Sequence, residues 1–258
     1  MYWLIDTHAH LEEIDNPEQV ITAAMAAGVV AIVAVGSDYR SNEKVRAIAE
    51  QYKGFVYPAF GLHPWNISQT DVDATLQFIE SHITEAVGIG EIGLDYQKQV
   101  RARTDKEAQQ KVLRELLRLA KTYDKPALIH SRYAWQDAFD MAVEAKLTKA
   151  VFHWYTGTSS VLQGIMEQGY YLSATPAVEY HEEHRRAIKE IPLERLLLET
   201  DSPVTYMRGR QEQFDARPAD VVRVLKTVAT LRGLPEEEIA EITTANAVRL
   251  FGLATPQY

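Results

Sequence analysis

The sequence of 258 residues contains no cysteine. This absence excludes disulfide bonds, cysteine-type zinc sites, iron–sulfur clusters and a thiol nucleophile. Long hydrophobic runs are also missing, because the longest, Val29 to Val35, is far too short to span a bilayer. The N-terminus lacks the basic region followed by a long apolar one that marks a secretory signal. We therefore expect a cytoplasmic protein without a membrane partner.

The sequence also lacks an excess of basic residues over acidic ones. The formal net charge is -9 and the isoelectric point is near 5.4. This balance argues against broad electrostatic binding of a nucleic acid duplex, which normally needs a basic face. Divalent cations held in a cleft would nevertheless create a local positive potential on an acidic protein. The charge thus disfavours a tight duplex binder and leaves open an enzyme that acts on nucleic acid ends.

No low-complexity segment and no linker rich in proline, glycine and serine divides the chain. The hydrophobic fraction of 46% and the charged fraction of 24% are typical of a soluble globular protein with a large core. We therefore expect one domain, covering residues 1–258.

Short runs of β-branched and aliphatic residues alternate with helical patterns, as is typical of βα units and a parallel sheet. The predicted strands cover about residues 3–8, 29–36, 55–60, 86–91, 126–130, 149–153, 170–174 and 196–200. The predicted helices cover about residues 17–27, 40–52, 71–83, 106–123, 135–146, 158–168, 181–190, 218–231 and 236–251. In a chain of this length, the pattern favours an α/β fold of the TIM barrel type, (β/α)8.

The clearest helical pattern lies at 106–123. An apolar stripe runs along it through Val112, Leu116, Leu119 and Tyr123. Thr104, followed by a glutamate three residues later, predicts a capping box at its start.

Metal-binding side chains recur where the predicted strands end. The set is His8, His10, Glu91, His130, His153 and Asp201. Side chains alternate along a strand, so His8 and His10 point the same way and form a two-nitrogen claw. A single histidine or carboxylate at a strand end is usually structural or caps a helix. Because the C-terminal ends of barrel strands meet at one face, the recurrence predicts a metal site there.

These residues stand within a longer series of motifs. In order, it reads Asp6-Thr7-His8-Ala9-His10-Leu11, Gly61-Leu62-His63-Pro64, Gly90-Glu91-Ile92-Gly93-Leu94-Asp95-Tyr96, Ile129-His130-Ser131-Arg132, Val151-Phe152-His153 and Glu199-Thr200-Asp201-Ser202-Pro203, closed by Thr243-Thr244-Ala245-Asn246. The series resembles the TatD family of metal-dependent hydrolases, within the amidohydrolase-like barrels, over nearly the whole chain.

The resemblance implies a dinuclear site and hydrolysis of phosphodiester bonds in DNA, with single strands or ends as the expected substrate. It implies that His8, His10 and Asp201 hold one divalent ion, that His130 and His153 hold the other, and that Glu91 bridges them. Asp201 would also accept a proton from the attacking water. Imidazole-rich ligation suits Zn, Mn, Fe, Co or Ni better than Mg, although the sequence does not name the ion.

Two further residues are candidates for substrate binding. His63 could contact a substrate phosphate or be an ordinary loop histidine, and Arg132 could pair with phosphate or with a loop carboxylate. Trp65 could stack a base, but packing at the barrel mouth is the favoured interpretation. Glu199 is expected to face the barrel interior, with an indirect role behind the metal ligands left open.

Where the chain departs from the TatD pattern, substrate choice could differ. Trp65 follows the His-Pro pair, where the family often has histidine, and Tyr133 follows Arg132, where it often has an acidic residue. The loop from Met207 to Pro218 replaces the usual Asn-Glu-Pro stretch.

Other classes of function remain as alternatives. One is an amidohydrolase that cleaves a C–N or carboxylic ester bond in a small molecule. Related barrels often bridge their metals with a carboxylated lysine, whereas this chain offers Glu91, and its nearest lysine is Lys98. Another is a catalytically idle scaffold, which the complete set of ligands disfavours, because unused buried charged groups destabilise a core.

Overall fold

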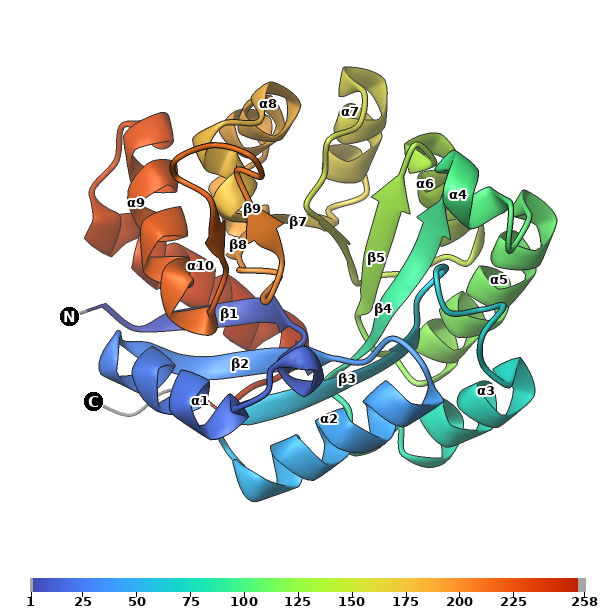
Figure 1. Ribbon diagram of the computed structural model, residues 1–258. Helices are drawn as coiled ribbons and strands as arrows, with labels where there is room; N and C mark the ends of the chain where they lie inside the picture. The colour runs from blue at the N-terminus through green and yellow to red at the C-terminus, as the bar shows by residue number, and fades with distance from the viewer. Residues whose placement is uncertain (1, 255–258) are drawn as a thin grey trace.

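The computed structural model describes residues 2–254 and forms an α/β barrel, with parallel strands inside a ring of helices (Figure 1). The strands pair in chain order in one eight-stranded sheet, which confirms the predicted (β/α)8 fold class. They are β1 (Leu4–Ala9), β2 (Val29–Val35), β3 (Val56–Leu62), β4 (Gly88–Asp95), β5 (Ala127–Arg132), β6 (Ala150–His153), β7 (Tyr171–Ala174) and β8 (Leu196–Leu198). Residue 1 and residues 255–258 of the expected domain lie outside the described range.

The helices follow the strands at nearly the predicted positions. They are α1 (Pro17–Ala26), α2 (Tyr39–Gln51), α3 (Val72–Ser81), α4 (Lys98–Arg101), α5 (Lys106–Thr122), α6 (Trp135–Glu144), α7 (Ser159–Glu167), α8 (Glu182–Glu190), α9 (Val221–Arg232) and α10 (Glu236–Phe251). The short helix α4 was not predicted. In the part of the chain that the structure describes, no helix is both long and apolar enough to cross a membrane.

The start of α5 differs from the prediction. Its N-cap is Asp105, whose carboxylate accepts the backbone N–H of Ala108 at 2.9 Å. The predicted capping box at Thr104 is therefore wrong. At the other end of the stripe, Tyr123 is 39% exposed, whereas Val112, Leu116 and Leu119 are buried. The apolar face thus ends one turn earlier than predicted.

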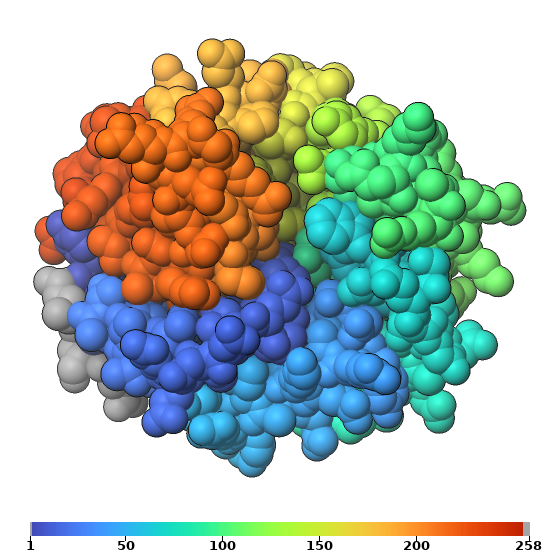
Figure 2. Space-filling view, in the orientation of Figure 1, coloured from blue at the N-terminus to red at the C-terminus, as the bar shows by residue number. Residues whose placement is uncertain are grey.

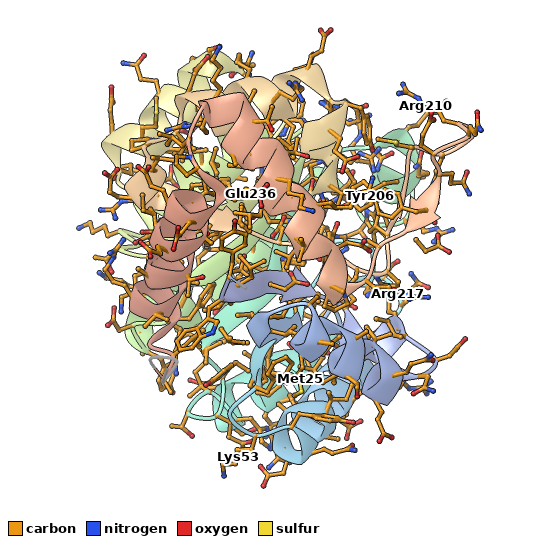
Figure 3. All side chains as sticks on the ribbon, turned by 90° about the vertical axis from the view of Figure 1, so that its left-hand side faces the viewer. Met25, Lys53, Tyr206, Arg210, Arg217 and Glu236 are labelled. Atoms are coloured by element: carbon orange, nitrogen blue, oxygen red, sulfur yellow. The ribbon has the colours of Figure 1, made fainter. Side chains whose placement is uncertain are left out.

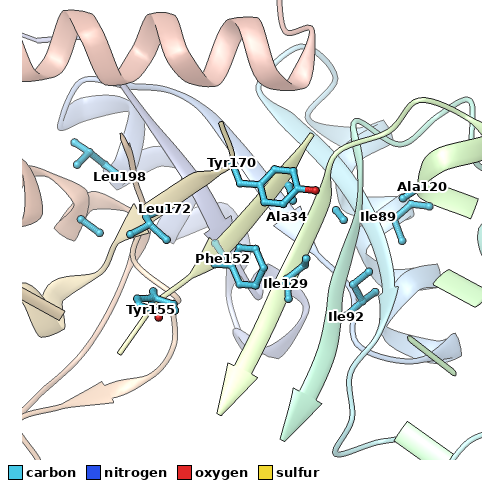
Figure 4. Close-up of a cluster of buried hydrophobic side chains, with 14 of the residues drawn as sticks. Ala34, Ile89, Ile92, Ala120, Ile129, Phe152, Tyr155, Tyr170, Leu172 and Leu198 are labelled. Carbon is cyan, nitrogen blue, oxygen red and sulfur yellow. The ribbon is translucent and has the colours of Figure 1, made fainter. Parts of the chain in front are cut away.

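Two apolar clusters hold the barrel together. One lies between strands and helices and includes Ile129, Phe152, Leu172 and Ala120 (Figure 4). The neighbouring strand residues Leu128, Val151 and Leu197 belong to the other cluster, which also contains residues of α10. Since neighbours on a strand face opposite sides, the latter cluster fills the barrel interior. It lies below the C-terminal strand ends.

The barrel closes between β1 and β8 through a narrow seam. Its backbone contacts are a parallel bridge between Ala9 and Ser202 and the hydrogen bonds around it. Side chains complete the seam: Thr200 donates to the carboxylate of Asp6 from its backbone N–H at 2.9 Å and from its hydroxyl at 2.6 Å. Thr7 Oγ1 donates to the carbonyl of Leu198 at 3.0 Å. The start of the Asp-Thr-His-Ala-His motif therefore closes the barrel.

A hairpin follows β8, with strands β9 (Thr205–Tyr206) and β10 (Phe214–Asp215). Arg210 lies near its tip, and Tyr206 and Arg217 lie closer to the barrel (Figure 3). Tyr206 is buried, and its hydroxyl donates to the carbonyl of Thr200 at 3.0 Å. The hairpin thus stands on the same edge of the barrel as the residues that follow β8.

His184 of α8 should make the stability of the fold depend on pH. Burial lowers its pKa to about 4, and its neutral ring accepts the backbone N–H of Thr175 at 3.1 Å and lies 3.0 Å from the carbonyl of Tyr155. The folded-state pKa lies below the unfolded value of about 6.5. Protonation therefore favours unfolding, so this stability is fully present above pH ~6.5 and is lost as pH falls toward ~4.

We expect His184→Gln, which can still donate and accept, to lose less stability than the wild-type protein between pH ~7 and ~4.5. Urea denaturation of both proteins in chelator, at both pH values, measures the difference. Equal losses would contradict a buried neutral histidine.

Candidate metal centre

Glu91 lies inside β4 and points into the barrel because the strand is irregular there. The pairing of β4 with β5 shifts register between Ile89 and Ile92, and both isoleucines pack in the cluster that faces the helices. The extra residue between them re-aims the intervening side chain, as in a β-bulge. Gly61 of β3 permits the close approach, because a Cβ there would overlap the backbone of Gly90 and Glu91. The prediction that Glu91 ends a strand is therefore wrong in detail: β4 continues to Asp95.

Histidines from four strand ends surround the Glu91 carboxylate, and its two oxygens divide them into two groups. Oε2 faces β1, with Nε2 of His10 at 3.2 Å and Nε2 of His8 at 3.6 Å. Oε1 faces Nε2 of His153 at 2.8 Å, Nδ1 of His130 at 3.0 Å and Nε2 of His63 at 3.5 Å. The sequence-predicted ligands are therefore brought together, as expected for the mouth of a barrel.

Asp201 joins the β1 side of this group. Its Oδ1 lies 3.6 Å from Nε2 of His8 and 3.7 Å from Nε2 of His10. The residue has φ 52°, in the left-handed region that costs energy for a residue other than glycine. Its backbone N–H donates to the carbonyl of His8 across the barrel seam at 3.0 Å. The seam thus holds this carboxylate against both histidines of β1.

The ring nitrogens that face away from Glu91 meet carboxylates of their own. Nδ1 of His10 lies 3.4 Å from Glu12, and Nε2 of His130 lies 3.5 Å from Asp95. Nδ1 of His153 lies 3.4 Å from Glu199, which also approaches Nδ1 of His8 at 4.0 Å. A carboxylate behind an imidazole orients the ring and raises its basicity toward a metal.

Sequence reasoning missed Glu12 and Asp95 and left the role of Glu199 open. Glu199 faces the interior as expected, and its contacts place it behind two of the histidines. The Asp95 signal was available in the sequence, because it belongs to the Gly-Glu-Ile-Gly-Leu-Asp motif and shares a strand with Glu91.

The cluster concentrates negative charge where it is buried. Burial raises the pKa of Glu91, but the surrounding histidines outweigh it and hold the pKa well below its usual range. Burial lowers the pKa values of His10, His130 and His153, but their carboxylate partners raise all of them above the ordinary value. The field between these carboxylates therefore favours positive charge, and a divalent cation can supply it in place of protons.

The donor set fits a metal centre. The residues form several groups of three, and within each group the three ligand atoms, one from each residue, lie within 4.8 Å of one another. The groups include His8 with His10 and Glu91, His8 with His153 and Asp201, and His63 with Glu91 and His130. Neither ring nitrogen of His8 has a hydrogen-bond partner among the described residues, although His8 is fully buried. A buried imidazole without partners is costly, and coordination of a cation would satisfy it. Nitrogen and oxygen donors of this kind suit transition-metal ions.

Comparison with known proteins places this centre in a family. A family model described as TatD related DNase matches residues 5–252. The chain belongs to the TatD family of metal-dependent hydrolases. This membership confirms the predicted class, a metal-dependent hydrolase that acts on ester bonds.

Individual TatD relatives align along most of their length. Deoxyribonuclease TATDN3 of Homo sapiens is 32% identical over 261 residues, covering 96% of this chain and 94% of the relative. A protein named 3'-5' ssDNA/RNA exonuclease TatD, from Citrobacter rodentium, is 29% identical and covers 93% of each. The crystal structure of YjjV, a TatD homologue from Escherichia coli, is similar with a TM-score of 0.88 at 31% identity, covering 97% of this chain and 98% of that one. The TatD barrel therefore extends over nearly the whole chain.

Glu199 offers a test of the carboxylates behind the histidines. We expect Glu199→Gln to weaken metal binding by about 10- to 100-fold, because it removes the charge behind His153 and His8 while keeping the shape. Competition with a chelating dye measures the affinity. Glu190→Gln, at an exposed position of α8, is the matched control. Unchanged affinity in the folded Glu199 variant would contradict this role.

Proposed function

We propose that this protein hydrolyses phosphodiester bonds in DNA at a centre that holds two divalent ions, with Glu91 bridging them. The observation that carries the proposal is the division of the histidines by the two Glu91 oxygens. His8 and His10, together with Asp201, would hold one ion beside Oε2. His130 and His153 would hold the other beside Oε1. When bound, such a pair of cations activates a phosphodiester and an attacking water as Lewis acids.

The ligand types also bear on which ions the centre accepts. Four imidazoles with two carboxylates favour Zn, Mn, Fe, Co or Ni over the all-oxygen surroundings typical of Mg, although Mg remains among the ions to test. The carboxylates behind the rings would keep each ligand nitrogen unprotonated and aimed at its ion.

Asp201 has the surroundings of a proton acceptor. Burial raises the pKa of its carboxyl above the ordinary value, and nearby histidines oppose that rise. A carboxylate with a raised pKa takes a proton more readily at neutral pH. Asp201 would therefore hold one ion and accept the proton of the attacking water.

The neutral ring of His63 can donate a hydrogen bond from Nε2 toward the centre. The backbone N–H of Trp65 donates to its Nδ1 at 3.2 Å, so Nδ1 carries no proton and the neutral ring carries it on Nε2. Burial lowers the pKa of His63 to about 3, which keeps the ring neutral at physiological pH. Its Nε2–H points to the Glu91 side of the centre, where it would donate to a phosphate oxygen of the substrate rather than bind an ion.

Arg132 supplies an exposed cation at the end of β5. Among the described residues it forms no ion pair, so the salt bridge that was its alternative role is absent there. A guanidinium without a protein partner can bind a phosphate through paired hydrogen bonds. We assign it to the substrate phosphate next to the reacting one.

DNA is the substrate class that the relatives support. Human TATDN3 is named a deoxyribonuclease, and the relative from Citrobacter rodentium is named a 3'-5' exonuclease of single-stranded DNA and RNA. The net charge of -9 disfavours extended duplex contact. We therefore propose single strands or strand ends as the substrate.

The amidohydrolase alternative has less support. Lys98 is exposed on α4, whereas the buried carboxylate of Glu91 stands among the histidines, where it would bridge the ions. A carboxylated lysine bridge is thus unavailable from the nearest lysine.

A metal add-back assay tests the function. Metal-stripped protein should leave a single-stranded DNA oligonucleotide intact, and hydrolysis should return when Zn, Mn, Co, Ni, Fe or Mg is added separately. His153→Ala and Asp201→Asn should each abolish the restored activity, because the first removes a ligand and the second removes a ligand's charge and the proton acceptor. His181→Ala, at a partly exposed position outside the cluster, should retain it. Metal-restored hydrolysis that survives in either ligand variant would refute the site assignment.

Arg132→Ala tests the substrate contact. We expect the variant to raise KM by roughly tenfold and to lower kcat less, because a charge-assisted hydrogen bond to a neighbouring phosphate acts in the ground state and the transition state alike. Steady-state kinetics on a DNA oligonucleotide separate the two constants, with Arg114→Ala on α5 as the control. A fall in kcat at constant KM would instead assign Arg132 to the transition state.

A further inference from the structure

An acidic groove lies on one side of the barrel mouth. Where β8 meets β1, a groove of about 650 Å³ is lined by carboxylates of Glu13, Asp15 and Asp215, with the guanidinium of Arg217 among them. Three carboxylates against one guanidinium repel a phosphodiester backbone. A nucleic acid strand is therefore disfavoured in this groove.

The wall across the barrel, above β3, β4 and β5, is basic. The segment after β4 carries exposed Lys98, Arg101 and Arg103, and Arg132 lies at the end of β5. Among the described residues, none of these four cations forms an ion pair with a carboxylate. Because β4 and β5 are neighbours in the sheet (Figure 1), their C-terminal ends place these cations on one side of the mouth. In Figure 2 a hollow lies between the orange residues after β8 and the cyan and green residues on this opposite side.

The basic wall also exposes two large aromatic side chains. Trp65, after β3, is 48% exposed, and Tyr133, after β5, is 62% exposed. In the part of the chain that the structure describes, the other exposed large hydrophobic residues are Tyr2, Met25 and Tyr123. Two of five such residues thus stand beside the metal ligands, although exposed rings are costly in water.

Trp65 is held in place by contacts with residues at the candidate metal centre. Its indole Nε1–H donates to Oδ2 of Asp95 at 2.6 Å, and the same oxygen faces Nε2 of His130 at 3.5 Å. Its ring packs edge-on against His63, with the centroids 5.1 Å apart. The polar edge of the indole is therefore tied down beside two residues of the centre, while about half of the side chain stays open to solvent.

Tyr133 combines an exposed ring with an unusual backbone conformation. It has φ 55°, a left-handed conformation that a bulky residue adopts only at a cost. Its ring packs edge-on against Trp135, with the centroids 5.8 Å apart. It follows Arg132 directly and His130 by three residues, so an exposed ring, a free cation and a metal ligand lie on one short segment.

We propose that Trp65 and Tyr133 form a ledge on which unpaired bases of the substrate strand stack, while its phosphates run along Arg132 and the cations of the α4 segment. The proposal rests on the proposed function and assigns the side chains that would bind its single-stranded substrate. Aromatic faces bind every base, and neighbouring cations follow the backbone, which is the chemistry of sequence-tolerant single-strand binding. A base-paired duplex, whose bases are already stacked on one another, cannot use the ledge.

Binding by metal-free protein tests the ledge independently of catalysis. A short end-labelled oligodeoxythymidylate and the same strand with abasic residues are titrated with wild-type protein, and fluorescence anisotropy reports the dissociation constants. We expect the intact strand to bind about tenfold or more tightly than the abasic one, as loss of base stacking implies. In the Trp65→Leu/Tyr133→Ala variant this preference should fall to about unity.

Further variants separate stacking from a structural role. Trp65→Phe removes the N–H to Asp95 but keeps an aromatic face, so it should retain a preference for the intact strand that Trp65→Leu loses. If Phe and Leu lose it alike, Trp65 acts through Asp95 and the ledge is overturned. Tyr123→Ala, an exposed tyrosine at the other end of the barrel, is the matched control and should keep the full preference.

The phosphate path has its own readout in the salt dependence of binding. Lys98→Gln/Arg101→Gln/Arg103→Gln should reduce the slope of log Kd against log salt by about 0.7 for each phosphate that the variant no longer neutralises. The same charge removed from exposed positions of α5, as Arg114→Gln/Arg118→Gln/Lys121→Gln, should leave the slope unchanged. Equal slopes in both triple variants would overturn the path along α4.

Hydrolysis of the same two strands by metal-loaded protein distinguishes the possible failures. Wild-type protein could cleave DNA and yet show no preference for the intact strand over the abasic one, in binding or in cleavage. In that case the ledge is wrong and the proposed function stands. If no ion restores cleavage but the base preference is present and depends on Trp65 and Tyr133, the function is wrong and the ledge stands as a base-binding site. If both results are absent, both proposals fall.

Discussion

Five imidazoles surround the buried carboxylate of Glu91, and the arrangement of the site depends on that concentration of charge. An ionised carboxylate without compensation inside a protein costs several kcal/mol or more, so positive charge has to be gathered around it. The ligands come from strands that are far apart in the chain. A closed parallel sheet is the arrangement that brings their C-terminal ends together, and the bulge in β4 turns the carboxylate into their midst.

Further carboxylates extend this charge pattern beyond the centre. Glu12, Asp95 and Glu199 stand behind the histidines, so carboxylate, imidazole and carboxylate alternate along several lines through the site. Asp95 also accepts hydrogen bonds from Trp65 and from Gln97, which start the loops after β3 and β4. The buried side chain of Asp95 therefore links the position of the His130 ring to the shape of the barrel mouth.

The alternation of apolar runs with amphipathic helices was enough to predict the barrel, because burial on both faces of a parallel strand leaves a continuous apolar signal. The predicted ligands likewise gather around Glu91, because strand polarity alone places strand ends on one face. Asp95 and Glu12 could not be found in this way. Their contacts depend on which nitrogen of a ring faces inward, and that depends on side-chain rotation rather than on position along a strand. The cap of α5 was missed because Thr104 and Asp105 are adjacent residues that both suit the position, and packing of Thr104 into the interior decides between them.

A cation bound at the seam between β1 and β8 would also affect the stability of the fold. His8 and His10 lie on one side of it and Asp201 on the other, so a cation held by all three would cross-link segments separated by most of the chain. Such a link restricts the unfolded state in the way that a disulfide does, and this chain has no cysteine with which to form one. Natural selection for catalysis and for a long-lived fold would then act on the same three side chains, and loss of any of them would lower the stability of the barrel as well as its activity.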